Sequence, residues 1–386
     1  MLMTPTSSSG PAQGLRESRR IIETDPSSVL VSFYGVTRSY DGKTKVVDDL
    51  DLEIRKGEFL TLLGPSGSGK TTSLMMLAGF EQPDQGHIYL NGKPIDGLPP
   101  EARDIGVVFQ NYALFPHMTV AQNVGFPLRV RGLAKAEIDR RVRDALKIVR
   151  LEDFADRRPT ELSGGQQQRV ALTRALVFEP QLVLMDEPLG ALDKQLREQL
   201  QLEIKHIQKR LGLTILYVTH DQSEALTMSD RIAVFGAGRI QQLGHPRDIY
   251  DHPANAFVAT FIGDNNLMPA TVHEVRGERA AVRLGNGALI ETSRSSHAHA
   301  GAPVTVAIRP ERFVIDPSGP VAGTLAAKVS EIIYVGDQTR VVARLEDGHE
   351  VEVRLANGRR AADPLEGATV TLGWHEGDAI LLDRAA

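Results

Sequence analysis

The chain has 386 residues, enough for two or three domains of roughly 150 residues each, and is 41% hydrophobic and 24% charged. Its formal net charge of −5 argues against a general nucleic-acid binder, because such proteins usually carry a basic face. The absence of cysteine excludes a disulfide framework and a thiolate metal site. No apolar run approaches the roughly 18 residues of a membrane-spanning helix, so we expect any membrane contact to go through a partner.

The N-terminal segment is rich in Ser, Pro, Gly and Arg and lacks the apolar core of a secretory signal, which predicts a disordered tail over 1–28. From Val29 onward, β-branched and aromatic residues become dense. Four later runs are short and continuously apolar: "FLTLL", "QLVLMD", "LTILYVT" and "RIAVF". Such runs are typical of strands in a parallel sheet that helices cover on both faces, so we predict an α/β domain over 29–262.

The stretch "GPSGSGKTT" follows the first of these runs and precedes a helical pattern, the context of a phosphate-binding loop. Glycines permit tight turns that aim backbone N–H groups at phosphate oxygens, and the following helix adds its positive end. We expect Lys70 to reach the β- and γ-phosphates of a nucleotide and Thr71 to place its hydroxyl on Mg²⁺. The alternative is a structural glycine turn. The predicted nucleotide contacts are Gly64, Pro65, Ser66, Gly67, Ser68, Gly69, Lys70, Thr71 and Thr72.

Two acidic residues end the apolar run "LVLMD". Asp186 stands where a carboxylate holds Mg²⁺, and Glu187 follows it in a position to polarise a water that attacks the γ-phosphate. By themselves these two residues are typical of a cap or a solvated pair. Beside a phosphate loop they indicate hydrolysis. His220, which ends "LYVTH", is a further candidate, for contact with the γ-phosphate or orientation of the water, although a lone His after a strand is more often structural.

A second stretch suited to phosphate, "LSGGQQQRV", begins at Leu162, far along the chain from the first loop. By itself it is also compatible with an ordinary Ser cap at the start of a helix. Before it, "AEIDRRVRDALKIVRL" places apolar residues at spacings of three and four, which predicts one buried face of a helix. These face residues are Ile138, Val142, Ala145, Leu146 and Val149.

Composition changes near Gly263, after which short alternating runs are broken by Gly, Asn and Asp. This pattern predicts a β-rich domain over 263–386, either a small barrel or a sandwich. The "HAHA" stretch at 297–300 contains two histidines without an acidic or third histidine neighbour, so we interpret it as a loop and not as a metal site.

Taken together, "GPSGSGKTT", "VVFQ", "LSGGQQQRV", "LVLMDEP", "ALD" and "VTH" resemble, in order and spacing, the ATP-binding subunit of an ABC transporter. The resemblance extends from about residue 30 to the C-terminus. It implies a P-loop ABC ATPase cassette, with a RecA-like core and a helical subdomain at about 112–168, followed by an OB-like barrel of the TOBE type. ATP and Mg²⁺ are the implied ligands.

The resemblance also assigns roles to single residues. Tyr40 matches the aromatic residue that stacks on adenine, and Gln110 matches the residue that touches Mg²⁺ or the attacking water. Asp193 matches the aspartate of the D-loop, and His220 matches the switch histidine. Gly190 stands where many members have Ser, which removes one hydroxyl from the start of that loop.

In the resembling family, two chains pack head to tail and each signature loop covers the ATP held by the other chain. This implies a homodimer in which Ser163, Gly164, Gly165 and Gln166 contact the partner's nucleotide, with a helix that starts near Gln166. The implied further partners are two transmembrane permease subunits and an external solute-binding protein. The chain would then be peripheral, at the cytoplasmic side of the inner (plasma) membrane. Tyr112, Leu114, Phe115 and Met118 are candidates for the surface that receives the permease.

The segment "GRIQQLGHPRDIYDHPANAFVATFIGDNNL" and the "IRPER" stretch resemble importers with a TOBE domain. Among these, "PLGALDKQLREQLQLEIKHIQ" and "FIGDNN" are most similar to the spermidine/putrescine branch. Ferric iron, sugar and sulfate remain alternative cargoes. A soluble ABC ATPase without transport function, or a regulatory binding module, remain alternative classes, although intact Glu187 and His220 argue against an inactive ATPase.

Overall fold

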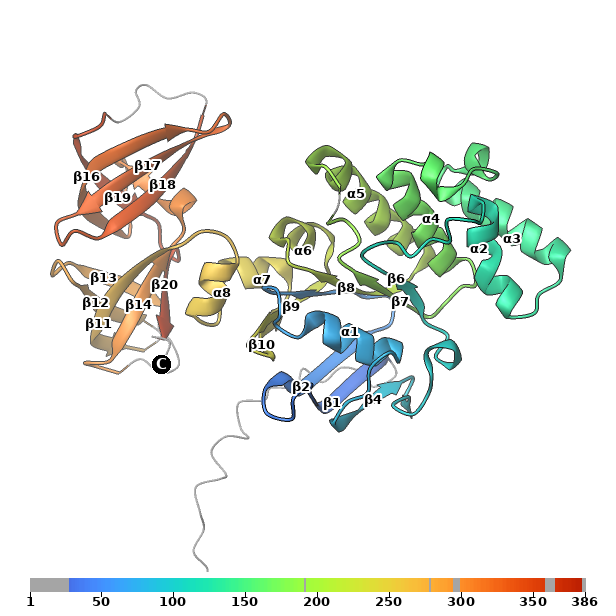
Figure 1. Cartoon of the computed structure of the whole chain (residues 1–386). Helices are drawn as coiled ribbons and strands as arrows, with labels where there is room; N and C mark the ends of the chain where they lie inside the picture. Colours follow the sequence, from blue (N-terminus) through green and yellow to red (C-terminus); the bar gives the residue numbers. More distant parts are fainter. Residues whose placement is uncertain (1–27, 191, 278, 294–298, 358–364, 384–386) are drawn as a thin grey trace, which may run out of the picture.

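The computed structural model describes residues 28–190, 192–277, 279–293, 299–357 and 365–383 (Figure 1). The predicted tail lies, apart from Ser28, outside this part of the chain, as does His297. Within the described ranges, no helix combines the length and the apolar composition needed to cross a bilayer.

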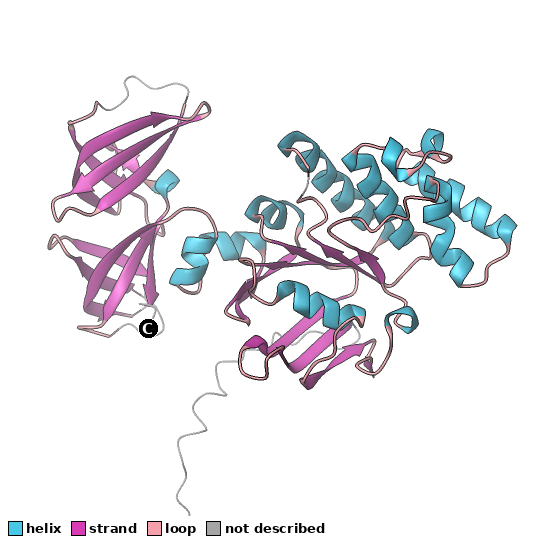
Figure 2. Ribbon diagram, viewed as in Figure 1, coloured by secondary structure: helices cyan, strands magenta, loops and turns pink. Residues whose placement is uncertain are grey.

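The N-terminal half contains two sheets, with α1 (Lys70–Ala78) between them (Figure 2). The first sheet is antiparallel, in the order β2 (Lys45–Arg55), β1 (Val29–Ser39), β4 (Gln85–Leu90) and β5 (Lys93–Pro94). The second has six strands in the order β10 (Arg239–Gly244), β9 (Arg231–Gly236), β3 (Phe59–Leu63), β8 (Thr214–Thr219), β7 (Leu182–Asp186) and β6 (Gly106–Val108). All its pairs are parallel except that of β9 with β10, so the predicted parallel sheet is confirmed.

Apolar side chains on both faces of the six-stranded sheet form separate cores. Leu60 and Leu62 point to one face and pack with Leu74 of α1 and with the first sheet. Phe59 and Tyr217 belong to the core on the other face, which the longer helices cover. The central strands β3, β7 and β8 are therefore buried on both sides, which explains why their sequences are continuously apolar and not alternating.

The helices on the second face are α2 (Val120–Val130), α3 (Lys135–Ile148), α4 (Gly164–Leu176), α5 (Lys194–Leu211) and α6 (Gln222–Met228). Short 3₁₀ turns lie at η2 (Pro100–Ala102), η3 (Glu152–Phe154) and η4 (Pro159–Glu161). Val142 and Leu146 are buried, and Ile138 and Ala145 pack beside them, which confirms the predicted apolar face of α3.

Two short helices, α7 (Pro246–Asp251) and α8 (Ala256–Phe261), lead into the β-rich half. Its first sheet has the order β13 (Leu289–Ser293), β12 (Arg279–Leu284), β11 (Asn266–Arg276), β14 (Pro303–Ile308) and β20 (Ala379–Asp383). After η5 (Pro310–Arg312), the second has the order β15 (Val314–Ile315), β19 (Thr369–Trp374), β16 (Gly323–Tyr334), β17 (Gln338–Leu345) and β18 (Glu350–Ala356). Both sheets are antiparallel and share one core that includes Trp374, so this half is the expected OB-like, all-β unit.

A buried arginine joins the β-rich half to the helices before it. Arg309 is 4% exposed, and its guanidinium stacks 3.5 Å from the centroid of the Tyr250 ring. Its Nη1 donates to the Ile262 carbonyl at 2.8 Å and its Nε to the Tyr250 carbonyl at 3.1 Å. Ala259 of α8 packs beside it on Ala307. We propose that the domain boundary lies at this junction, near residue 263.

Replacing Arg309 with Met should loosen this junction. The carbonyls of Tyr250 and Ile262 lose their donor, and an unsatisfied buried group costs about 1–3 kcal/mol. We expect a lower melting temperature and faster proteolysis near residue 263. Arg312→Met is the matched control, because Arg312 is half-exposed and forms ion pairs with Asp251 and Asp378. Identical digestion of the two variants would contradict the role assigned to Arg309.

Candidate active site

The loop between β3 and α1 passes very close to neighbouring backbone. Gly67 and Gly69 have φ of 77° and 103°, a region that residues with a Cβ atom rarely adopt. A Cβ at Gly69 would lie 2.4 Å from the Val46 carbonyl oxygen, and one at Gly64 would lie 2.5 Å from that of Phe235. Space therefore requires glycine at position 64, the dihedral angle favours it at position 67, and both require it at position 69.

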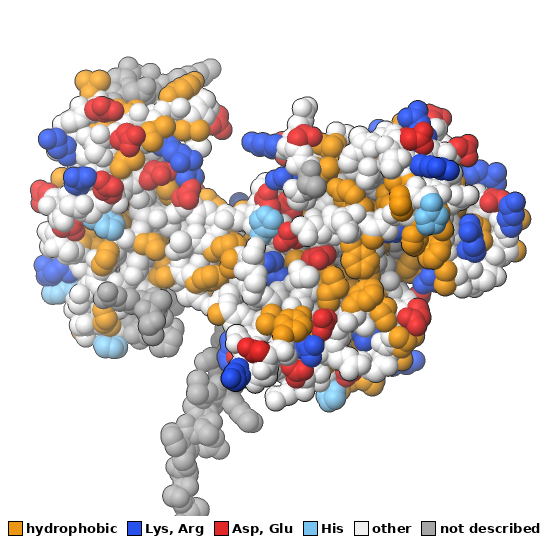
Figure 3. All heavy atoms as spheres, in the orientation of Figure 1, with side chains coloured by type: hydrophobic (Ala, Val, Ile, Leu, Met, Phe, Trp, Pro, Cys, Tyr) orange, Lys and Arg blue, Asp and Glu red, His pale blue; other side chains and the backbone are white. Residues whose placement is uncertain are grey.

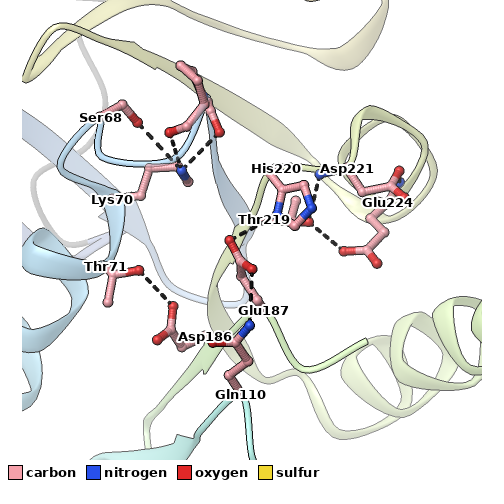
Figure 4. Close-up of polar contacts among 12 residues, drawn as sticks. Ser68, Lys70, Thr71, Gln110, Asp186, Glu187, Thr219, His220, Asp221 and Glu224 are labelled. Carbon is pink, nitrogen blue, oxygen red and sulfur yellow. Dashed lines mark hydrogen bonds and ion pairs between the residues drawn. The ribbon is translucent and has the colours of Figure 1, made fainter. Parts of the chain in front are cut away.

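Lys70 is the first residue of α1 and is only 4% exposed. Its Nζ donates to the carbonyl oxygens of Gly64 and Pro65, both at 2.9 Å, and lies 3.5 Å from Ser68 Oγ (Figure 4). Burial lowers the pKa of Lys70, while the charges of Glu187 and Asp186 act to raise it. The ammonium group is thus held over the concave side of the loop by the loop's own oxygens.

Thr71 and Asp186 form the second contact of the site. Thr71 Oγ1 donates to Asp186 Oδ1 at 3.0 Å, which joins the start of α1 to the end of β7. Burial raises the pKa of the Asp186 carboxyl, and the Glu187 charge raises it further, while the Thr71 hydrogen bond and Lys70 oppose this shift. A hydroxyl and a carboxylate oxygen at this distance are suitable ligands for a small hard cation such as Mg²⁺.

Glu187, His220 and Gln110 meet beside this pair (Figure 4). His220 Nδ1 lies 3.0 Å from Glu187 Oε1, and Gln110 Nε2 donates to Glu187 Oε2 at 3.5 Å. Because an ionised carboxylate only accepts hydrogen bonds, this contact requires the proton of His220 to be on Nδ1. The residues follow β7, β8 and β6, which are neighbours in the sheet. The direct contact of His220 with Glu187 was not part of the sequence prediction.

Tyr40 lies on the other side of the loop. Its ring is 59% exposed, its hydroxyl lies 3.4 Å from Thr72 Oγ1, and the Arg38 guanidinium is 5.1 Å from its centroid. Arg38 is itself held by Glu81 and Asp84. An exposed aromatic face next to the phosphate loop is suitable for stacking on a base, so the prediction for Tyr40 has a consistent geometry.

The signature stretch forms the start of α4. Ser163 is the N-cap, with its Oγ accepting from Gln166 N at 3.4 Å while Gln166 Oε1 accepts from Ser163 N at 2.9 Å. The helix begins at Gly164, two residues before the predicted start, because this capping box closes its first turn. Within the described residues, the side chains of Ser163 and Gln166 bond only to each other's backbone. The structure does not bring them to the phosphate loop of the same chain.

Gly164 and Asp193 complete the predicted set. Gly164 is exposed, whereas Gly165 is buried, and a Cβ at Gly165 would lie 3.0 Å from Leu196 Cδ2. Asp193 is exposed and caps α5, since its side chain accepts from Leu196 N at 3.0 Å. In this chain it therefore acts as a helix cap, and any contact with a nucleotide remains a prediction.

One candidate for the docking surface is wrong. Tyr112 is only 7% exposed, because Arg174 donates to its carbonyl at 2.8 Å and holds the segment against α4. Leu114, Phe115 and Met118 are half-buried and retain some accessible surface. Of the two histidines in the "HAHA" stretch, only His299 lies within the described residues, and its Nδ1 lies 3.3 Å from the Ala300 carbonyl. Over the described ranges, no cluster of three or more His, Cys, Asp or Glu is suited to a metal ion.

Sequence reasoning missed a buried group behind His220. Tyr217, Thr219 and Glu224 are at most 2% exposed, and the two hydroxyls both donate to the Glu224 carboxylate. A Glu two residues into a short helix gave no signal of its own, since exposed helix starts commonly carry acidic residues. A Tyr and a Thr on the same face of "LYVT" were the available hint that a polar partner lies beneath them.

Comparison with known proteins places these features in a family. A profile described as ABC transporter matches residues 47–190, and one described as TOBE domain matches residues 306–382. The spermidine/putrescine import ATP-binding protein PotA of Rubrobacter xylanophilus is 46% identical over 372 residues, which cover 96% of each chain. The protein of that name from Pseudomonas aeruginosa UCBPP-PA14 is 50% identical over 331 residues, 85% of this chain and 91% of its own.

Solved structures match the N-terminal half. The cbiO1 protein of Clostridium perfringens, part of the ABC transporter complex cbiONQ, is 32% identical with a TM-score of 0.54, over 57% of this chain and 90% of its own. A dimeric, post-hydrolysis structure of the ATP-binding cassette MJ0796 with ADP and Pi is 34% identical with a TM-score of 0.52, over 56% of this chain and 99% of its own.

The close packing of the phosphate loop predicts the effect of a single methyl group. Gly64→Ala places a Cβ against the Phe235 carbonyl, so the loop must shift, and we expect ATP affinity to fall by about tenfold or more. Gly97→Ala is the matched control, because no atom lies within 4 Å of its Cβ position. Binding is measured with a fluorescent ATP analogue. Equal affinities of the two variants would show that the loop tolerates displacement.

Proposed function

This chain belongs to the ATP-binding subunits of ABC transporters, an ATPase family, and we propose that its site hydrolyses ATP to drive import of a polyamine. The observation that carries the proposal is the cluster of Glu187, His220 and Gln110 beside the phosphate loop. A loop that only bound a nucleotide would have no use for a carboxylate held by two hydrogen-bonding side chains at its open edge.

In the proposed mechanism, the phosphate loop and Lys70 hold the triphosphate. Phosphate oxygens replace the carbonyls of Gly64 and Pro65 as acceptors for Nζ, so the ammonium exchanges neutral partners for charged ones. Tyr40 stacks on the base at the exposed side. Thr71 and Asp186 would hold Mg²⁺, with Gln110 as a further oxygen ligand in reach, and the cation would neutralise charge on the phosphate oxygens.

Glu187 accepts a hydrogen bond from the attacking water and polarises it toward the γ-phosphate. His220 holds one carboxylate oxygen through Nδ1, and Gln110 fixes the second carboxylate oxygen. Glu187 is 19% exposed at its side chain, so water reaches it, whereas Asp186 is buried. This difference supports separate roles for two adjacent carboxylates: Asp186 for the cation and Glu187 for the water.

The signature loop is proposed to act on the nucleotide of a second copy. Ser163 and Gly164 are exposed, and the N-terminal end of α4 carries a partial positive charge suited to phosphate. Asp193 lies at the start of the neighbouring helix α5, where it would meet the partner. The dimeric title of the MJ0796 structure describes that protein, and we extend the arrangement to this chain.

The remaining partners follow from the importer assignment. We infer a homodimer attached to two permease subunits on the cytoplasmic side of the plasma membrane, with an external solute-binding protein. Figure 3 shows hydrophobic side chains gathered on one face of the cassette, between α1 and α2. Phe80 is 54% exposed and packs on Phe109, and Leu114, Phe115 and Met118 are partly exposed. The accessible apolar surface of these side chains supports a docking surface for the permease.

The polyamine cargo is inferred from relatives. Spermidine/putrescine import proteins match at 45–50% identity over most of the chain, including the β-rich half, and ferric iron, sugar and sulfate are the alternatives. The same coverage argues against a soluble ABC ATPase or a purely regulatory module. A transport measurement identifies the cargo.

Glu187→Gln tests the shared site. The amide keeps the shape but accepts no proton, so hydrolysis should stop while ATP binding persists, and the chain should form an ATP-dependent dimer in size-exclusion chromatography. Adding Ser163→Arg should dissolve that dimer. Thr119→Arg is the matched control, since Thr119 caps α2 with the same capping box and Gln122 partner. If both arginine variants behave alike, loss of a cap explains the result and the shared site fails.

Uptake by cells tests the cargo. Disruption of the gene should reduce uptake of radiolabelled spermidine and putrescine several-fold and leave uptake of maltose, sulfate and ferric iron unchanged. The parent gene should restore polyamine uptake, whereas Lys70→Ala should not, because it removes the charge that binds the β- and γ-phosphates. Normal polyamine uptake with a defect in another solute would assign the transporter to that solute.

A further inference from the structure

A buried carboxylate lies directly behind the catalytic cluster and has no role in the mechanism above. Glu224 of α6 is 2% exposed and accepts from Thr219 Oγ1 at 2.7 Å (Figure 4). It also accepts from Tyr217 OH at 2.8 Å. Both donors bond to the same atom, Oε2. A buried carboxylate requires such donors, but two hydroxyls from one strand fix the geometry of that strand as well.

The Thr219 hydroxyl makes a second bond that bears on His220. While it donates to Glu224, it accepts from the backbone N–H of Asp221 at 3.0 Å. The hydroxyl therefore bridges the residues on both sides of His220. Val218 directly precedes Thr219 on β8, and its carbonyl accepts from Glu187 N at 3.0 Å. The backbone at His220 and the backbone at Glu187 are therefore both hydrogen-bonded to the end of β8, at Thr219 and Val218.

Arg197 of α5 anchors this arrangement from the other side. Its Nη1 lies 3.1 Å from Asp221 Oδ2, and its Nη2 donates to the Leu192 carbonyl at 3.0 Å. The remaining oxygen of Asp221 accepts from Ser223 N at 2.8 Å and caps α6. Asp221 therefore has little freedom, and the Thr219 hydroxyl sets where the peptide after His220 lies.

We propose that Thr219, oriented by the buried Glu224 carboxylate, is the positioning residue for His220. It acts by holding the imidazole where Nδ1 donates to Glu187, and it touches neither the nucleotide nor the water. The inference rests on the proposed roles of Glu187 and His220 and adds to them the group that maintains their contact. Without the hydroxyl, the peptide between Thr219 and Asp221 loses its anchor and His220 turns away from Glu187.

Thr219→Val tests this, because valine keeps the shape and removes only the hydroxyl. We expect kcat for ATP hydrolysis to fall about tenfold or more with KM for ATP unchanged, since a displaced catalytic group slows chemistry without weakening binding. Thr219→Ser should restore most of the activity. Thr61→Val is the matched control: Thr61 is buried on β3, pairs in register with Tyr217, and accepts from Ser229 Oγ at 2.6 Å. It should lose stability but keep kcat.

A double-mutant cycle separates positioning from general damage. In a His220→Ala background, Thr219→Val should cause no further loss, because its target is gone. A full additional loss there, or parental kcat in the single variant, would overturn the inference. If Thr219→Val does not fold, as judged by circular dichroism, Glu224→Gln replaces it in the same cycle. Glu224→Gln removes the charge that orients the Thr219 hydroxyl. A full additional loss in the His220→Ala background, or parental kcat in the single variant, would again overturn the inference.

Side-chain ¹⁵N spectra of the histidines give a readout that needs no turnover. The His220 signal is identified by its loss in His220→Ala, and in the parent it should show the tautomer protonated on Nδ1. Thr219→Val should shift this signal, and Thr61→Val should not. An unchanged signal in Thr219→Val rejects the positioning role even if ATPase activity falls. A parent that shows this tautomer but does not hydrolyse ATP would instead reject the proposed function.

Discussion

The register of three parallel strands is the constraint on which the site depends. Asp186 lies beside Val218, and Met185 lies between Val108 and Tyr217, so β6, β7 and β8 end at the same edge of the sheet. Because neighbouring strands are about 4.8 Å apart, side chains that follow these ends are brought within hydrogen-bond reach without any long-range adjustment. A shift of one residue in β8 would turn His220 to the opposite face and replace it at this edge with the side chain of Thr219 or Asp221.

The parts of this site that sequence could predict are those with a local signal. Continuous apolar runs predicted the parallel strands, and the glycine spacing before Lys70 predicted the phosphate loop. The contact between His220 and Glu187 could not be predicted, because it depends on which strands are neighbours. Burial of Tyr112 was missed for a similar reason: an aromatic residue in a loop is compatible with core or surface until its neighbours are known. The Arg309 junction joins segments far apart in sequence, and no local pattern indicates it.

The burial of two charged side chains favours the binding of ligands with complementary charge. Lys70 and Asp186 are both almost inaccessible, and burial opposes the charged form of each, lowering one pKa and raising the other. The loop carbonyls that bond Lys70 are neutral, and Thr71 supplies Asp186 with a single hydroxyl. Anionic phosphates and a cation would offset this unfavourable burial. A ligand that binds the folded state in this way also stabilises it, so the same groups link nucleotide binding to stability.

The two helix starts in the cassette are consistent with the proposed pairing of two chains. The first turn of α1 is directed at its own phosphate loop, and its N-cap, Gly69, offers no side chain to the free N–H groups. At α4, Ser163 and Gln166 already satisfy part of the helix end, so the turn is formed before any partner arrives. A preformed turn loses little conformational entropy when it docks, which favours binding to a rigid target such as a bound triphosphate. In the proposed head-to-tail pairing, the start of α4 in one chain would cover the phosphate loop of the other, so each chain would complete the nucleotide site of its partner.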